Sequence, residues 1–101
     1  HRHFRRQRQM CIRDSFERDF RQATLDAETF IKRESVDDRA FGCVINMAFQ
    51  LGLPRLLKFK NFQYHLNKCD YQSASNEMLD SRWAKQTPNR ANELADIMRN
   101  I

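Results

Sequence analysis

Glycine and proline are scarce in this sequence, with two of each among 101 residues. β-Sandwiches and barrels need many tight turns, and tight turns draw heavily on these two residue types. The scarcity therefore argues against such folds and favours helices joined by short turns. With 41% hydrophobic and 31% charged residues, the composition is that of one globular domain and is too apolar for a disordered chain.

Cysteine is also sparse, and its spacing predicts neither a disulfide framework nor a zinc site. The three cysteines form no C-x-x-C pair, and their odd number leaves at least one thiol unpaired, as is usual in a reducing compartment. The histidines have no metal-ligand spacing with any Cys, Asp or Glu. We therefore expect no metal and no cofactor. The residues concerned are Cys11, Cys43, Cys69, His1, His3 and His65.

Long hydrophobic runs are missing as well. The longest one, over residues 44–51 with its neighbours, is about half the length of a membrane span and is interrupted by Asn46 and Gln50. No signal-peptide pattern opens the chain. We therefore expect no membrane span.

The net charge of +5 is unevenly distributed. Residues 1–13 hold five arginines and no acid, and the other 13 basic residues are balanced by 13 acidic ones. Such an arm could contact nucleic acid or an anionic envelope surface. The other interpretation is a loose or foreign terminus, and we favour it because chain termini are usually loose. The predicted organisation is an arm over residues 1–14 followed by one helical domain over residues 15–101, with nucleic-acid binding unlikely.

The first half of this domain predicts two helices of different character. Apolar residues at positions 16, 20, 23, 27, 30 and 31 form one stripe on an amphipathic helix. Ser35 is the expected N-cap of the next helix, with Asp38 three residues further on. Between residues 40 and 51 only Gly42, Asn46 and Gln50 are not apolar. This pattern predicts a helix buried nearly all round, whose thin polar stripe faces a cleft or a polar network.

The second half predicts shorter helices with clear boundary signals. Gly52 closes the central helix and Pro54 starts a short one; residues 59–68 can form another. Asp70 and Ser81 are expected caps, and Thr87-Pro88 marks the start of a last helix. Trp83 is expected in the core. The predicted fold is all-α, a compact bundle of about five to seven short helices around one buried central helix.

Two segments, residues 46–52 (NMAFQLG) and residues 81–91 (SRWAKQTPNRA), carry a resemblance to a known family. The first resembles the end of the central helix of phage-type lysozymes, glycoside hydrolase family 24, and the second resembles that family's signature S-[RK]-W-x-x-Q-x-x-x-R-A. The resemblance covers roughly residues 16–101 and identifies them as the carboxy-terminal helical lobe of such an enzyme. Residues 1–14 match nothing in the family.

The resemblance implies a bacteriolytic endolysin that hydrolyses the β-1,4 bond between N-acetylmuramic acid and N-acetylglucosamine in peptidoglycan. The family's catalytic carboxylates and a threonine lie in an amino-terminal segment of the form E-x8-D-x5-T. Here Glu17 and Asp26 have the first spacing, but Lys32 stands where threonine is required, and no glycine precedes Gly42 to form the family's hairpin. We therefore predict no catalytic residue in this chain, and no activity of the chain alone.

The resemblance also implies which residues line the cleft. Phe49, Gln50, Phe62 and Glu77 are the predicted substrate-binding residues, although Phe62 and Glu77 replace smaller or amide side chains of better-known members. Arg90 is the predicted partner of the catalytic acid, and Asn46 belongs to the polar stripe of the cleft. Simpler roles remain open: a core aromatic for Phe49, a surface ion pair for Arg90, and amides satisfied within the core for Asn46 and Gln50.

The predicted partners are peptidoglycan and a separate amino-terminal catalytic lobe. The expected location is the host cytoplasm, with action on the cell wall after the membrane is permeabilised. The alternative function is a non-enzymatic helical module that binds an anionic polymer through its arginine-rich arm.

Overall fold

The fold is all-α over residues 19–101, the part of the chain that this computed structural model describes. The predicted arm over residues 1–14 lies outside the described residues. Residues 19–30 are helical. They are followed by the 3-10 turn η1 (Arg33–Ser35) and by helices α2 (Asp38–Leu51), α3 (Leu53–Leu56), α4 (Lys60–Asn67), α5 (Tyr71–Leu79), α6 (Arg82–Gln86) and α7 (Pro88–Arg99).

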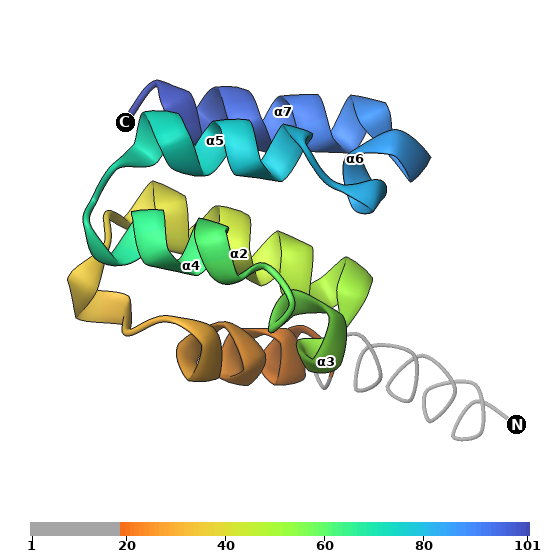
Figure 1. Cartoon of the computed structure of the whole chain (residues 1–101). Coiled ribbons are helices and arrows are strands. Elements are labelled where there is room, and N and C mark those ends of the chain that lie inside the picture. Colours follow the sequence, from red (N-terminus) through yellow and green to blue (C-terminus); the bar gives the residue numbers. More distant parts are fainter. Residues whose placement is uncertain (1–18) are drawn as a thin grey trace, which may run out of the picture.

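The helices are arranged in three tiers (Figure 1). Helices α5 and α7 pack against each other at the top of the view, α2 and α4 form the middle tier, and the helix of residues 19–30 lies below with α3. Helix α2 contacts both α7 and α3, and α4 contacts α5. The predicted all-α bundle is therefore confirmed, with α2 in its middle.

One hydrophobic core joins the tiers. Its largest fully buried side chains include Phe30, Phe62, Met47, Leu56 and Leu66. The rings of Phe30 and Phe62 stack with their centroids 5.9 Å apart, so the lower helix is attached to α4. Burial of such side chains contributes about 1.5–3 kcal/mol each, and this burial is the main source of the fold's stability.

Polar contacts fix the ends of the helices against their neighbours. Gln63 Nε2 donates to the Phe30 carbonyl at 2.6 Å, and the Asp37 N–H donates to the Tyr71 hydroxyl at 3.0 Å. The first bond joins α4 to the end of the helix below it. The second joins the start of α5 to the start of α2, across 34 residues of sequence.

Most of the predicted boundaries are confirmed. Gly52 ends α2 with a φ of 79°, and its N–H donates to the Ala48 carbonyl at 2.8 Å. The Asp70 carboxylate accepts from the Ser73 N–H, and Ser81 Oγ accepts from the Ala84 N–H. Each of these caps acts within four residues of its own position, which explains why local sequence signals sufficed.

Three local predictions are wrong. Ser35 does not cap α2, because the chain adds the turn η1 and the Asp37 carboxylate caps the helix by accepting from the Arg39 N–H. Helix α2 is less buried than predicted, since Phe49 is exposed beside Asn46 and Gln50 of the predicted polar stripe. Phe20, assigned to the apolar stripe of the first helix, is 51% exposed.

Candidate functional site

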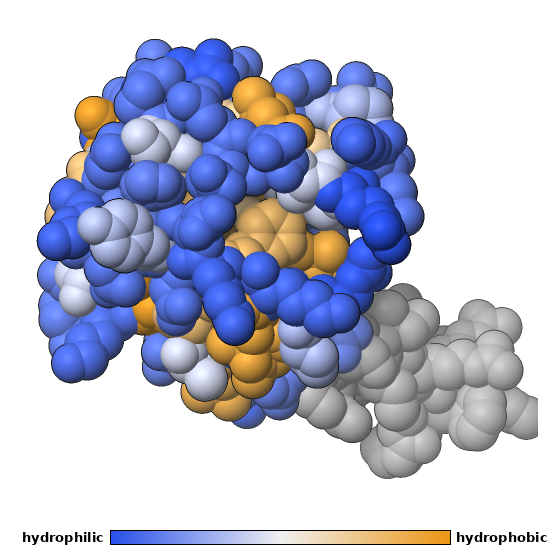
Figure 2. Space-filling model, in the orientation of Figure 1, coloured by the Kyte–Doolittle hydropathy of each residue, from blue (hydrophilic) through white to orange (hydrophobic). Residues whose placement is uncertain are grey.

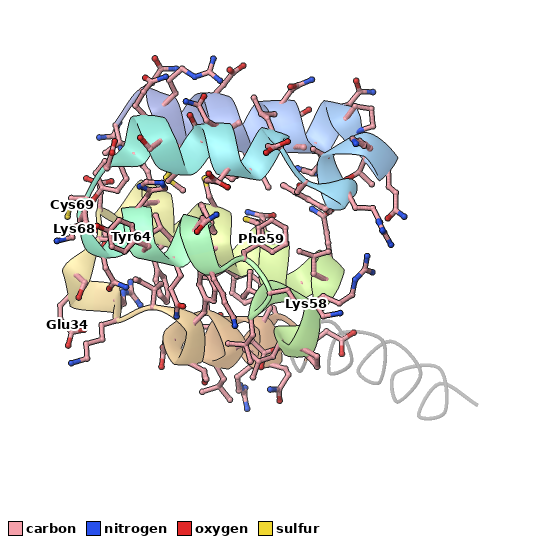
Figure 3. All side chains as sticks on the ribbon, viewed as in Figure 1. Glu34, Lys58, Phe59, Tyr64, Lys68 and Cys69 are labelled. Carbon is pink, nitrogen blue, oxygen red and sulfur yellow. The ribbon has the colours of Figure 1, made fainter. Side chains whose placement is uncertain are left out.

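A pocket of about 420 Å³ opens where α3, α4, α5 and α6 meet. On the face shown in Figure 2, an apolar area lies in the middle and is surrounded by hydrophilic side chains. Figure 3 labels Phe59 and Lys58 in the same region. The pocket is lined by Leu51, Arg55, Lys58, Phe59, Lys60, Asn61, Phe62, Glu77, Asp80, Ser81, Arg82 and Trp83.

The apolar wall of the pocket is aromatic and continuous with the core. Phe59 is half-buried and meets the fully buried Phe62 edge to face, with ring centroids 6.1 Å apart. Phe62 in turn stacks on Phe30, and Trp83, 3% exposed, supplies another wall. Because Phe62 and Trp83 are almost fully buried, Phe59 presents the accessible apolar surface of this wall, and the buried rings behind it hold it in place for contact with a ring or an alkyl chain.

Charged side chains surround this wall. Arg55, Lys58, Lys60 and Arg82 are exposed cations, and Glu77 and Asp80 are the acids that share the pocket with them. Within residues 19–101, none of the six forms an ion pair with another side chain. The pocket therefore carries two positive charges in excess.

Trp83 is held by hydrogen bonds at both its side chain and its backbone. Its indole Nε1–H donates to Gln50 Oε1 at 3.0 Å, which links α6 to the last turn of α2. Its carbonyl accepts from Thr87 Oγ1 at 2.9 Å, at the start of α7. The Gln50 amide of α2 therefore fixes the orientation of the indole, and the Thr87 hydroxyl fixes the backbone of α6.

The structure brings only part of the predicted substrate-binding set together. Phe62 and Glu77 line the pocket, and Gln50 adjoins it through the bond to Trp83. Phe62 is fully buried, so it supports the wall from behind. Phe49 is 49% exposed on α2 and is not among the lining residues.

Asn46 and Arg90 lie outside the pocket. Asn46 is exposed, and its Nδ2 donates to the Gly42 carbonyl of its own helix at 3.0 Å. The exposed Arg90 side chain lies 3.5 Å from Glu93 Oε2, one turn further along α7. The predicted pairing of Arg90 with a catalytic acid therefore stays a prediction, and the guanidinium already has a local partner.

The cations of the pocket were not predicted from the sequence. Arg55, Lys58 and Lys60 follow one another through the α3–α4 turn, and Arg82 belongs to the signature segment but was not assigned a role. The available signal was the run of basic residues over 55–60 without an acid. Such runs are usually solvated surface, and only the fold shows that this one faces Arg82.

The thiols in the described part of the chain differ in environment. Cys43 is buried in α2, where burial raises the pKa of its thiol to about 11. Its Sγ lies 3.5 Å from the Leu94 carbonyl. Cys69 is exposed, with Sγ 3.3 Å from the Ser35 carbonyl. A thiol protonated at neutral pH is a poor nucleophile, so Cys43 is a packing residue.

Two carboxylates with perturbed titration lie at helix starts rather than at the pocket. A hydrogen bond from the Arg39 N–H lowers the pKa of Asp37. Hydrogen bonds from Ser73 lower the pKa of Asp70, helped by the charge of His65. These shifts belong to helix capping.

Residues 19–101 contain no candidate metal site and no candidate membrane span. No group of three or more His, Cys, Asp or Glu side chains is placed to hold a metal ion. No helix in this part of the chain has both the length and the apolar character needed to cross a membrane.

Comparison with known proteins links part of the chain to lysozymes. No family model matches the sequence. A curated relative, "Probable T4-type lysozyme 1" of Dictyostelium discoideum, is 36% identical over 55 residues, which are 54% of this chain and 32% of the relative. The matching segment thus spans about a third of the relative's length, and the similarity supports a lysozyme-like relationship.

Proposed function

We propose that this chain is the carboxy-terminal helical lobe of a phage-type muramidase of glycoside hydrolase family 24. In this role it binds peptidoglycan while the bond between N-acetylmuramic acid and N-acetylglucosamine is hydrolysed. The observation that carries the proposal is the 36% identity over 55 residues to a T4-type lysozyme. The pocket supports it, because a preformed aromatic wall with polar groups around it is a common form of carbohydrate or peptide site.

In this proposal the substrate runs along the face that carries α2, α5 and α6. Gln50 and Trp83 form a rigid corner of the cleft, Glu77 offers an acceptor for hydroxyl or amide groups, and Phe62 keeps the aromatic wall in place. Phe49 and Asn46 extend the surface along the exposed side of α2. Arg90 gives up its contact with Glu93 and pairs with the carboxylate of the catalytic acid once that acid is present.

The catalytic groups come from another lobe in this proposal. Glycoside hydrolysis needs one carboxyl group as general acid and a second one to activate water or to stabilise the sugar cation. In the pair with E-x8-D spacing, Glu17 lies outside the described residues. Asp26 accepts a hydrogen bond from Gln22 Nε2 on the surface of its own helix. It is not a lining residue of the pocket. We therefore expect binding without turnover from this chain alone.

The test separates binding from hydrolysis. The purified chain is added to chloroform-treated Gram-negative cells, and its co-sedimentation with purified peptidoglycan sacculi is measured in parallel. We expect sedimentation with sacculi but no clearing, and clearing when a catalytic lobe of the same family is supplied in trans. Clearing by the chain alone would overturn the non-catalytic assignment.

A matched pair of variants makes the binding test specific. Glu77→Ala should weaken co-sedimentation, whereas Glu28→Ala, on the exposed surface of the first helix, should not. Failure of the unmodified chain both to sediment with sacculi and to support clearing in trans would refute the lysozyme role.

A further inference from the structure

The described arginines fall into two groups, those within ion-pair distance of a carboxylate and those that form no ion pair within residues 19–101, which are Arg21, Arg33, Arg55 and Arg82. Arg39, Arg90 and Arg99 each lie within ion-pair distance of a carboxylate on their own helix or its cap. Arg55 and Arg82, from α3 and α6, face the same pocket and form no ion pair within residues 19–101. The pocket therefore gathers guanidinium groups from separate elements, and neither of them forms an ion pair with a described carboxylate.

Two lysines add to this charge. Lys58 lies in the turn after α3 and Lys60 begins α4, and both line the pocket. Four like charges around one small volume repel one another, and a bound anion relieves that repulsion. We propose that this pocket binds a compact ligand with two oxyanion groups, carboxylate or phosphate, next to an apolar or ring-shaped part.

The acids in the pocket set the charge of the ligand. Glu77 and Asp80 reduce the excess to two positive charges without pairing with any of the cations. A dianion would make the site neutral, while its carbon framework contacts Phe59, which is half-buried and lies over the buried Phe62. Glu77 opposes such a ligand, so its removal should strengthen binding.

The size of the pocket favours a compact dianion over an extended polyanion. A volume of about 420 Å³ lies in the range of ordinary small-molecule sites, roughly 300–1,000 Å³. An extended polyanion would instead need cations spread along a surface. This inference stands on the charges and shape of the pocket and does not depend on the proposed muramidase role.

The test uses the full chain and two probe anions. Glutarate, a dicarboxylate, and pyrophosphate are titrated separately at low ionic strength, with sodium chloride at matched ionic strength as the blank. Binding is followed by the fluorescence of Trp83, the single tryptophan of the sequence, and by backbone amide chemical shifts. We expect saturable changes for at least one probe, confined to residues 51–62 and 77–83.

Charge variants decide whether the pocket is responsible. Lys58→Gln combined with Arg82→Gln should raise the Kd at least tenfold, and Glu77→Gln should lower it severalfold. The matched control removes two exposed lysines elsewhere, Lys32→Gln with Lys68→Gln, and should leave the Kd within twofold. Figure 3 shows Lys68 on the opposite side of the view from Lys58. Far-ultraviolet circular dichroism checks that each variant is folded.

The outcomes are decisive in both directions. Binding of glutarate alone identifies a carboxylate ligand, and binding of pyrophosphate alone identifies a phosphate ligand. The proposal is overturned if neither probe saturates, if both double variants weaken binding equally, or if the shifts spread over all exposed cations.

Discussion

The hydrogen bond between Trp83 and Gln50 provides a direct test of how the pocket corner is stabilised. Gln50→Met keeps the length of the side chain and removes the oxygen that accepts from the indole N–H at 3.0 Å. Trp83 is 3% exposed, so the donor is left without its partner. An unsatisfied buried donor costs about 1–3 kcal/mol. We expect a value near the lower end, because Gln50 is exposed and water can approach from its side.

The assay is thermal unfolding followed by circular dichroism. In a domain of this size, 1 kcal/mol corresponds to a shift in Tm of about 4–8 °C. Gln50→Met should therefore lower the Tm by several degrees, and Gln50→Glu should not, because it retains an oxygen acceptor. Asn46→Ala is a second control, since Asn46 is exposed and bonds only to its own helix. Equal melting temperatures for the Met and Glu variants would refute the reasoning.

The remaining predictions concern the backbone, acid stability and a buried thiol. Gly42→Ala should stabilise the fold by roughly 0.5–1 kcal/mol, since a Cβ there meets nothing within 4 Å. Gly52→Ala should instead destabilise it by roughly 1–3 kcal/mol, because Gly52 has a φ of 79°. Denaturant unfolding measures both free energies, and equal effects of the two substitutions would contradict this distinction. Hydrogen bonds from Ser73 lower the folded-state pKa of Asp70, so its contribution is complete above the unfolded pKa near 3.8 and is lost as the pH falls through the folded value. Asp70→Asn should thus reduce the drop in Tm between pH 7 and pH 3, and an unchanged drop would exclude this role. Burial raises the pKa of the Cys43 thiol to about 11, so Cys43 should resist aromatic disulfide reagents at pH 8 until the chain unfolds. The reagent is tested on a variant in which the other two cysteines are changed to serine. Rapid labelling of the folded variant would show that the buried thiol becomes accessible without unfolding.

Local signals in the sequence predicted most helix boundaries correctly, but they predicted the wrong N-cap for α2. Asp70, Ser81 and Gly52 act on backbone groups a few residues away, so their residue types and neighbours suffice. Ser35 had the same type of signal and failed, because the carboxylate of Asp37 lies closer to the first free N–H groups of α2. Ser35 and Asp37 lie two residues apart, and the sequence alone does not show which of them caps the helix.

The site was less predictable because its contacts are distant in sequence. Gln50 and Trp83 are separated by 33 residues, and a pattern of apolar positions says only that an amide on α2 needs a partner. Arg55 and Arg82 are further examples, since only the packing of α3, α5 and α6 brings them to one pocket. The resemblance to lysozymes assigned Phe62 and Glu77 to substrate binding, and the fold places both at the pocket, one beneath its wall and one among its charges.

Trp83 also has a mechanical consequence for the molecule. Its indole is attached to the end of α2 and its carbonyl to Thr87, directly before the first turn of α7. That turn carries Arg90. One residue therefore ties three consecutive parts of the chain together, the end of α2, the short helix α6 and the start of α7. Any substitution of Trp83 removes both an apolar core side chain and the hydrogen bond that attaches α6 to α2.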